Sequence, residues 1–183
     1  MKKISITILL LMFTFSSFCQ QFDDQENLKQ NELKINMSNL IGFKWLDLNY
    51  EKILNEEASI GVSTLFSLDS ASEGLDEYRT FSLTPYYRHF FSSKYASGFF
   101  VEAFTMLHTG KEEIYYHNNG GSGSDYIDEK FTDLAAGISV GGKFVTKRGF
   151  VTEIYLGIGR DLLGNSDIEV VGRGGVSIGY RFK

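Results

Sequence analysis

The sequence predicts an all-β protein, a closed antiparallel up-and-down transmembrane β-barrel of about eight strands. Three observations predict this fold. Apolar and polar residues alternate along most of the chain, and several alternating segments reach the roughly 9–11 residues that a tilted strand needs to cross a bilayer core. Aromatic residues make up 15% of the chain and 19 glycines accompany a single proline, which favours strands over helices. The connections alternate between short and long, an asymmetry typical of membrane barrels.

The N-terminal segment predicts a secretory signal peptide. It reads MKKISITILLLMFTFSSFCQQ, in which Lys2 and Lys3 precede an apolar run over 4–15. That order is typical of signal peptides, and the run is shorter than the ~20 residues of a spanning helix. We expect cleavage after Cys19. The expected division is a signal peptide at 1–19, a short periplasmic segment at 20–31 and the barrel at 32–183.

Cys19 has a second interpretation, because a lipoprotein signal also ends at a cysteine, which then becomes the lipidated N-terminus. Such a signal has a leucine three residues before the cysteine and a small residue directly before it. Here Ser16 and Phe18 stand at those positions. A cleaved signal is therefore the favoured interpretation, and lipidation is the alternative.

Charge and cysteine content exclude several kinds of partner and chemistry. Cys19 is the only cysteine, so cleavage after it would leave no thiol for a disulfide or for catalysis. The chain has 18 basic and 23 acidic residues, and loss of Lys2 and Lys3 leaves 16 basic residues and a net charge of −7. We expect no nucleic acid as a partner, since phosphate binding needs a basic surface.

Eight alternating segments are expected to form the strands, at 32–40, 44–54, 58–68, 79–91, 98–109, 131–146, 150–161 and 172–182. Each from the second onward gathers apolar side chains on one face. In chain order that face comprises Leu46, Leu48 and Tyr50; Ile60, Val62 and Phe66; Phe81, Leu83 and Tyr87; Phe99 and Val101; Ile138, Val140 and Phe144; Ile154, Leu156 and Ile158; and Val176, Ile178, Tyr180 and Phe182.

The connections differ between the two ends of the predicted barrel. Tight turns are expected at 55–57, 92–97 and 147–149, and longer polar connections at 69–78, 110–130 and 162–171. With a periplasmic N-terminus, the tight turns are periplasmic and the longer connections lie outside. A short connection around 41–43 is the exception. An even number of strands returns the chain to the periplasmic side, where the strand ending at Phe182 closes the barrel.

The polar face favours a membrane barrel over a soluble lipocalin-like barrel, which would alternate too. It is rich in glycine and serine, which suits the narrow lumen of about eight strands. Its charges nearly balance, and no charge interrupts the apolar face in mid-strand, where Arg or Lys would cost about 2–4 kcal/mol. The polar face comprises Asp47, Asn49, Glu51, Ser63, Ser82, Thr84, Arg88, Glu102, Ser139, Gly141, Lys143, Glu153, Gly157, Ser177, Gly179 and Arg181.

Pro85 lies inside the expected strand 79–91. Proline cannot donate a ladder hydrogen bond, and a closed barrel has no free edge to accommodate it. We therefore expect a bulge or a strand end at this position.

Seven charged residues of the polar face form the strongest candidate for a functional group of side chains, a charge network in the lumen. They alternate in sign around the predicted wall. We expect them to form ion pairs that plug the lumen, because an unpaired charge in a narrow lumen is costly. A conducting or gated lumen is the alternative, although barrels of eight strands are generally filled by side chains. The residues are Asp47, Glu51, Arg88, Glu102, Lys143, Glu153 and Arg181.

The best candidate for a functional surface is the connection 110–130, in which residues 111–130 read KEEIYYHNNGGSGSDYIDEK. Tyr115, Tyr116, His117 and Tyr126 flank a centre of glycine, serine and asparagine. Aromatic residues on an exposed loop could contact a sugar, a protein or another cell surface. The alternative is that the segment extends the strand pair as a solvated hairpin.

We expect no catalysis, no cofactor and no metal. An outer-membrane enzyme that modifies lipid would need a serine, a histidine and an orienting carboxylate or amide near the lipid. His89 with Ser92 is the nearest pair and falls at an expected periplasmic turn, while His108 and His117 lie at a strand end and in a loop. The histidines also lack metal-ligand spacing. An enzyme acting on lipid A or phospholipid is the alternative function, as is a soluble lipocalin-like periplasmic carrier.

Several segments occur in an order that carries a family resemblance: YEKILNEEASIGVS, TPYYRHFF, GFFVEAF, VGGKFVTKRGFVTEIYLGIGR and a terminal SIGYRF. With the signal peptide, they resemble small outer-membrane β-barrels of a domain-of-unknown-function family from Gram-negative bacteria, over essentially the whole mature chain. The resemblance implies a location in the outer membrane, with membrane lipid as a partner. It also implies a structural or surface-interaction role and no assigned catalytic motif. It also implies that Tyr180 and Phe182 form a C-terminal signal for the barrel-assembly machinery, although Lys183 follows where the usual pattern ends on the aromatic.

Overall fold

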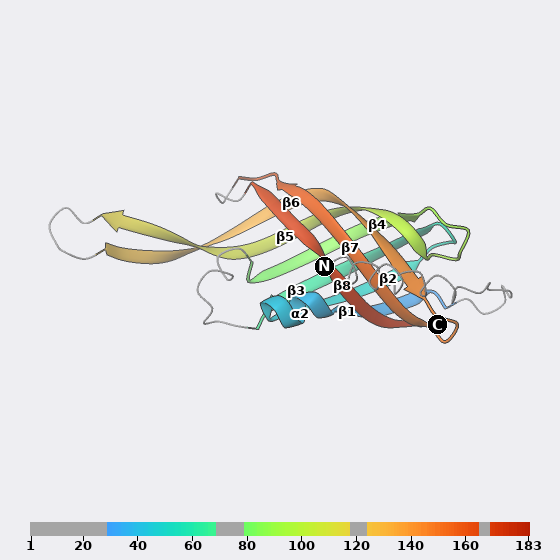
Figure 1. Cartoon of the computed structure of the whole chain (residues 1–183). Helices are drawn as coiled ribbons and strands as arrows, with labels where there is room; N and C mark the ends of the chain where they lie inside the picture. Colours follow the sequence, from blue (N-terminus) through green and yellow to red (C-terminus); the bar gives the residue numbers. More distant parts are fainter. Residues whose placement is uncertain (1–28, 69–78, 118–123, 165–168) are drawn as a thin grey trace, which may run out of the picture.

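The fold is a closed barrel of eight antiparallel strands (Figure 1). A computed structural model of the chain describes residues 29–68, 79–117, 124–164 and 169–183, with 112–117 and 124–129 described by their backbone alone. Each strand pairs with the next in sequence, and β1 pairs with β8 to close the sheet. The predicted up-and-down barrel is confirmed. The elements are β1 (Asn31–Asn36), α2 (Met37–Phe43), β2 (Trp45–Ile53), β3 (Ala58–Ser67), β4 (Phe81–Phe90), β5 (Gly98–His117), β6 (Ser124–Val145), β7 (Phe150–Asp161) and β8 (Val170–Phe182).

The helix α2 replaces the end of the first predicted strand. The prediction of a strand over 32–40 and a tight connection near 41–43 is wrong from Met37 onward. Asn36 caps the helix, because its side chain accepts a hydrogen bond from the backbone N–H of Asn39, and Lys44 ends it with a left-handed φ of 53°. Within the described residues, no helix is long and apolar enough to cross a membrane.

Strands β5 and β6 are much longer than predicted. Their pairing continues without interruption as far as His117 and Ser124, so both strands project beyond the rest of the barrel (Figure 1). The predicted loop at 110–130 is therefore mostly a paired hairpin. The predicted signal peptide and the cleavage site after Cys19 lie outside the described residues.

The two ends of the barrel differ as expected. The three short turns, at 54–57, 91–97 and 146–149, lie at one end with the start of β1 and the C-terminus (Figure 1). Helix α2 and the projecting β5–β6 hairpin lie at the opposite end. We refer to these as the short-turn end and the hairpin end.

Pro85 lies in the middle of β4, so the expectation of a strand end is wrong. Leu83 pairs with Leu107 and Tyr86 pairs with Phe104 in the same register, which means that no residue is inserted between them. A bulge is therefore also absent from this part of the described sheet. The ladder between β4 and β5 is simply interrupted where proline has no N–H to donate.

Two clusters of buried apolar side chains occupy the lumen at different heights. One belongs to the short-turn end and the other lies further toward the hairpin end. The first comprises Ile53, Phe90, Ala96, Phe100 and Tyr155, and the second comprises Tyr86, Phe104, Met106, Ala135 and Val171. The charged residues described next lie among these rings.

Candidate functional site

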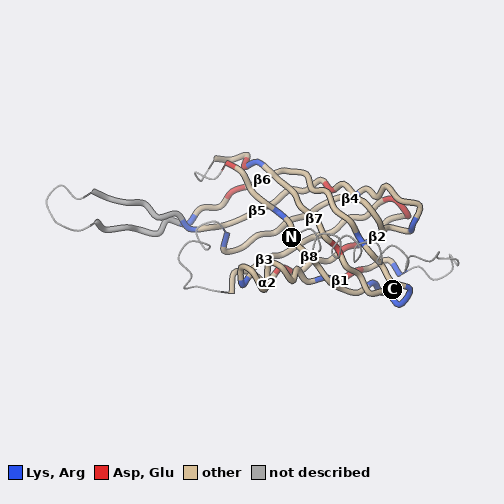
Figure 2. Tube along the Cα trace, viewed as in Figure 1, with Lys and Arg blue, Asp and Glu red and all other residues tan. Residues whose placement is uncertain are grey.

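The lumen is lined by charged side chains that are excluded from solvent, whereas large apolar residues are exposed on the outside of every strand. Alternation along each strand causes this arrangement, since successive side chains point to opposite faces of a sheet. Figure 2 marks where the acidic and basic positions fall along the strands. The charged residues buried in the lumen include Glu32, Lys34, Glu51, Arg88, Glu102, Lys143, Glu153, Arg173 and Arg181.

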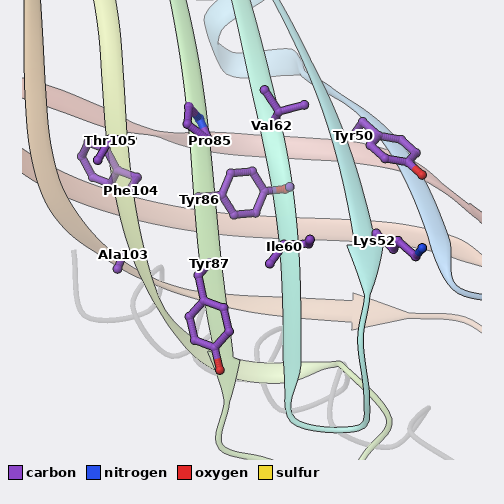
Figure 3. A pocket seen from close by; sticks show the side chains of 11 residues that line it. Tyr50, Lys52, Ile60, Val62, Pro85, Tyr86, Tyr87, Ala103, Phe104 and Thr105 are labelled. Carbon is purple, nitrogen blue, oxygen red and sulfur yellow. The ribbon is translucent and has the colours of Figure 1, made fainter.

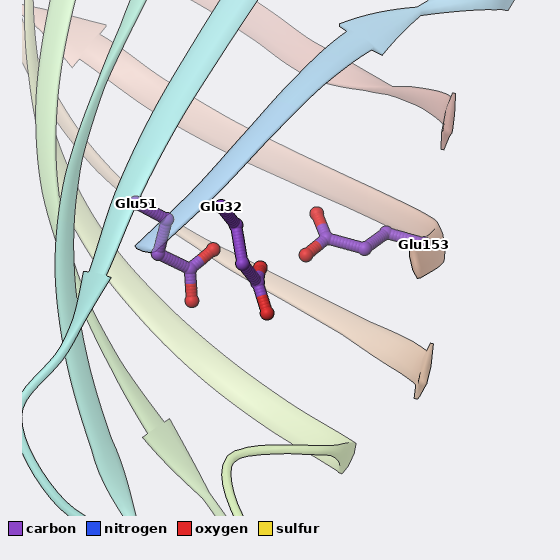
Figure 4. Close-up of side chains that lie close together, drawn as sticks. All are labelled: Glu32, Glu51 and Glu153. Atoms are coloured by element: carbon purple, nitrogen blue, oxygen red, sulfur yellow. The ribbon is translucent and has the colours of Figure 1, made fainter. Parts of the chain in front are cut away.

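Glu32, Glu51 and Glu153 come from β1, β2 and β7, and their carboxylates point toward one another (Figure 4). One oxygen of each lies within 4.8 Å of the others, a spacing that could hold a metal ion. Two ammonium groups, however, contact all three carboxylates. Lys34 Nζ lies 2.6 Å from Glu153 and 3.2 Å from Glu32, and it also bonds Glu51. Lys143 Nζ lies 2.9 Å from Glu32, 2.5 Å from Glu51 and 3.3 Å from Glu153. The two lysines already occupy the positions between the carboxylates that a cation would take, and we assign no metal to this cluster.

Arg88 joins strands that are not neighbours in the sheet. Its Nε donates to Glu102 at 2.6 Å on the adjacent strand β5. Its Nη1 donates to Glu51 at 2.9 Å and to Glu153 at 2.8 Å, on β2 and β7 across the lumen. The guanidinium also lies 4.3 Å from the centroid of the Phe100 ring. Such cation–π contacts strengthen when both groups are removed from water.

Arg181 lies at the short-turn end of the lumen. Its Nε donates to Glu32 at 2.6 Å, and its Nη2 donates to the backbone carbonyl of Ala96 at 2.7 Å. Ala96 belongs to the 91–97 turn, and its N–H donates to the carbonyl of Glu56 in the neighbouring turn. Ala96 is completely buried against Phe90 and other members of the first apolar cluster. The turn is thereby held across the end of the barrel.

Arg173 lies among aromatic rings further toward the hairpin end. Its Nη1 lies 3.1 Å from Glu102, and its guanidinium carbon lies 4.9 Å from the Tyr86 ring and 5.5 Å from the Tyr155 ring. The Tyr86 hydroxyl donates to Asn49 at 2.6 Å. Rings and guanidinium groups therefore pack against one another inside the barrel at this height.

Asp47 is the member of the predicted charge network that is held by neutral donors. Its Oδ1 accepts a hydrogen bond from Ser63 at 2.6 Å, and its Oδ2 accepts from the side-chain amides of Asn36 at 3.1 Å and Asn39 at 2.8 Å. Asp47 therefore fastens helix α2 to the wall. The structure brings the other six predicted residues, Glu51, Arg88, Glu102, Lys143, Glu153 and Arg181, into contacts with one another or with Glu32 and Lys34.

A buried histidine and aspartate pair lies near the hairpin end. The Nε2 of His108 is 2.8 Å from the Oδ1 of Asp161, while its Nδ1 is buried without a hydrogen-bond partner among the described residues. Among the described residues, therefore, no hydroxyl is bonded to this imidazole, as a serine nucleophile would have to be. The pair suggested by the sequence does not form either. His89 packs edge-on against Phe91, and the hydroxyl of Ser92 accepts from a backbone N–H in its own turn.

The predicted surface residues lie on the projecting hairpin. Tyr115 is directly opposite Tyr126, and His117 is opposite Ser124. The side chains of these residues and of Tyr116 lie outside the described residues. At the closing seam, Tyr180 pairs with Leu33 and Phe182 with Asn31, and both aromatic residues are exposed on the outer face.

Three parts of the site are missing from the sequence-based prediction: Glu32 with Lys34, Arg173, and the His108–Asp161 pair. Alternation in NELKIN would have revealed Glu32 and Lys34 as lumen residues. Leu33 and Ile35 point outward, so the two charged residues between and before them point inward. The pairing of His108 with Asp161 has no counterpart in the sequence pattern, because the two residues lie on β5 and β7, which are not neighbours.

No family model, curated protein or solved structure matches the chain. Its function is therefore inferred from its own geometry.

Proposed function

We propose that the protein is an outer-membrane β-barrel with a structural or surface-interaction role, whose lumen is plugged by its charged side chains. The observation that carries this proposal is the inversion of the two faces. Charge is buried inside, and apolar surface is exposed outside. A soluble barrel would have the opposite arrangement, with apolar side chains inside, because burying apolar surface away from water stabilises the fold by about 25 cal/mol per Å².

The exposed apolar residues surround the whole barrel. Leu156 is 74% exposed and Ile138 is 60% exposed, although both lie well inside their strands. Soluble monomers rarely expose contiguous apolar patches larger than a few hundred Å², and a lipid environment removes this cost. One exposed residue from each strand, in order, is Leu33, Leu48, Ile60, Leu83, Phe99, Ile138, Leu156 and Val176.

Closure of the sheet also supports a membrane location. Lipid offers no hydrogen bonds, so a spanning sheet must pair all of its edges. Here β1 pairs with β8 over Asn31 to Asn36, which leaves no open edge along β1. The C-terminal residues Tyr180 and Phe182 lie on this seam, where the barrel-assembly machinery would act during biogenesis.

The projecting β5–β6 hairpin is the part that we propose contacts an extracellular ligand or protein. Its strands are paired well beyond the barrel, so the register holds Tyr115 beside Tyr126 at a fixed place on the hairpin. Aromatic residues on a rigid support offer a large contact area at a low entropic cost. The plugged lumen, by contrast, offers no path through the barrel.

Fractionation of cells that express the whole chain tests this proposal. We expect the mature protein in the outer-membrane fraction, with a shift in its mobility on SDS gels between unheated and boiled samples. Closed membrane barrels resist SDS until they are heated. A soluble periplasmic protein without such a shift would contradict the proposal and would favour a carrier.

The lipid-modifying alternative has its own test. His108→Ala, His89→Ala and Ser92→Ala are compared with wild type for the lipid A and phospholipid profiles of the same cells. We expect all four profiles to be identical, because the described residues contain no hydroxyl bonded to His108. Loss of a lipid species in the His108 variant would instead support an enzyme.

A further inference from the structure

The interruption of the sheet at Pro85 creates a local feature of the outer wall. Within the described strands, Thr84 and Pro85 have no pairing partner on β5, although the pairs on both sides keep the same register. On the other side of β4, Pro85 still pairs with Val62 of β3. The gap therefore lies between β4 and β5, in the middle of the predicted membrane span.

A groove of about 620 Å³ lies on the wall beside this gap (Figure 3). Its volume is within the range of small-molecule binding sites. Ile60, Val62 and Pro85 give it an apolar lining, and Tyr50 and Tyr87 flank it. A further lining residue, Ala103 of β5, has only a methyl side chain, which leaves the backbone of β5 accessible from the groove.

The groove is charged at one end only. Lys52 is the single charged residue among those that line it, and it immediately precedes the last residue of β2 at the short-turn end. Figure 3 places Lys52 and the hydroxyl of Tyr87 nearer the short turns than Pro85 and Thr105. The groove thus runs from a cationic rim at the periplasmic interface to an apolar region in mid-wall. A lysine at this depth can extend its ammonium group to the headgroup region.

We propose that this groove binds one phospholipid of the periplasmic leaflet. An acyl chain lies along Ile60, Val62 and Pro85, and the phosphate pairs with the ammonium of Lys52. This inference rests on the proposed membrane location. It goes beyond that proposal because it distinguishes one lipid-binding position from the rest of the apolar wall, where lipid contacts are unspecific.

Photo-crosslinking tests the site. The mature chain is folded into vesicles of phosphatidylethanolamine and phosphatidylglycerol that contain a trace of phosphatidylglycerol with a diazirine on its acyl chain. Irradiation and peptide mapping then locate the label. We expect it to concentrate on β3, β4 and β5 around the groove, and to be much weaker on the outer face of β7 at Leu156 and Ile158.

Two pairs of variants make the result specific. Ala103→Phe fills the groove and should abolish the concentrated label, while Leu156→Phe adds the same ring to β7 and should leave it unchanged. Lys52→Gln should lower the label about fivefold, the effect of about one lysine charge near a phosphate surface. Lys130→Gln changes an exposed lysine at the hairpin end and should have no effect.

Equal labelling of β4 and β7, or label that resists both Ala103→Phe and Lys52→Gln, would overturn the phospholipid site. The SDS gel shift of the same vesicles separates this result from a failure of the proposed function. An inserted, heat-shifting barrel with even labelling contradicts the site alone. A chain that does not insert contradicts the membrane location and the site together.

Discussion

The Nη1 of Arg88 lies 2.8 Å from the Oε1 of Glu153, and this ion pair crosses the lumen from β4 to β7. Both side chains are completely buried. The same nitrogen also bonds Glu51 of β2. The guanidinium of Arg88 on β4 therefore links β2 and β7. Removing it would leave the carboxylates of Glu51 and Glu153 without this cation in a site that excludes water.

Arg88→Met should destabilise the barrel strongly. Breaking a buried ion pair by removing one partner costs about 3–5 kcal/mol, because the remaining charge stays buried. Urea unfolding in vesicles or detergent, followed by the loss of β-structure, measures this free energy. Arg160→Met is the matched control, since Arg160 is exposed on β7 and its loss should change the free energy of unfolding by less than about 0.5 kcal/mol. Equal effects of the two variants would contradict a structural role for the network.

The wild-type barrel should carry no steady ion current in a planar bilayer. We propose that Arg88, the two lysines and the aromatic rings fill the lumen, as is usual for barrels of eight strands. Replacing Arg88, Glu51 and Glu153 together by alanine removes the central ion pairs and should produce small open-channel currents. A stable current through the wild-type protein, inserted as shown by its heat shift, would show that the lumen is open.

Gly61→Ala should destabilise the barrel although it adds only one methyl group. A Cβ at Gly61 would lie 2.3 Å from the Tyr86 ring and 2.6 Å from the backbone oxygen of Tyr50, so Tyr86 would have to move and lose its bond to Asn49. We expect a loss of about 1–3 kcal/mol in the free energy of unfolding. Gly172→Ala on β8 is the control, because a Cβ there meets nothing within 4 Å. An unaffected Gly61 variant would contradict the packing described for Tyr86.

Trypsin added to intact cells should cut the hairpin but not the short turns. Lys111 and Lys130 lie opposite each other on the hairpin, at the proposed extracellular end. Lys147 and Arg148 lie in a short turn at the proposed periplasmic end and should be cut only after the outer membrane is opened. Peptide mass spectrometry distinguishes these products. Cleavage after Arg148 in intact cells would reverse the orientation.

Alternation predicts most of this structure because the period of two fixes which side chains share a face. Glu51, Arg88, Glu102, Lys143 and Glu153 were therefore assigned to the lumen from the sequence. Which of them would touch could not be predicted, since contacts across the lumen depend on the stagger of all eight strands. Arg88 reaches Glu153 only because β4 and β7 face each other at that height.

The errors have local causes. The helix α2 depends on Asn36 as an N-cap, and its seven residues carry too few turns to show a helical period. The hairpin extension over 110–130 is polar and glycine-rich, a composition typical of loops, yet its register continues that of the barrel strands. The sheet accommodates Pro85 because two residue pairs between β4 and β5 do not form. The sequence around Pro85 does not indicate this interruption.

The central claim is that the apolar outer face lies in lipid. A nitroxide attached to Leu156→Cys tests it most directly, in a protein expressed from Gln20 onward, which contains no other thiol. Among the large apolar strand residues whose side chains the structure describes, Leu156 is the most exposed. After folding into vesicles, power saturation of the electron paramagnetic resonance spectrum compares relaxation by oxygen, which concentrates in lipid, with relaxation by a water-soluble nickel chelate. The account predicts strong relaxation by oxygen and little by nickel. Strong relaxation by nickel would place this face in water and contradict a membrane barrel.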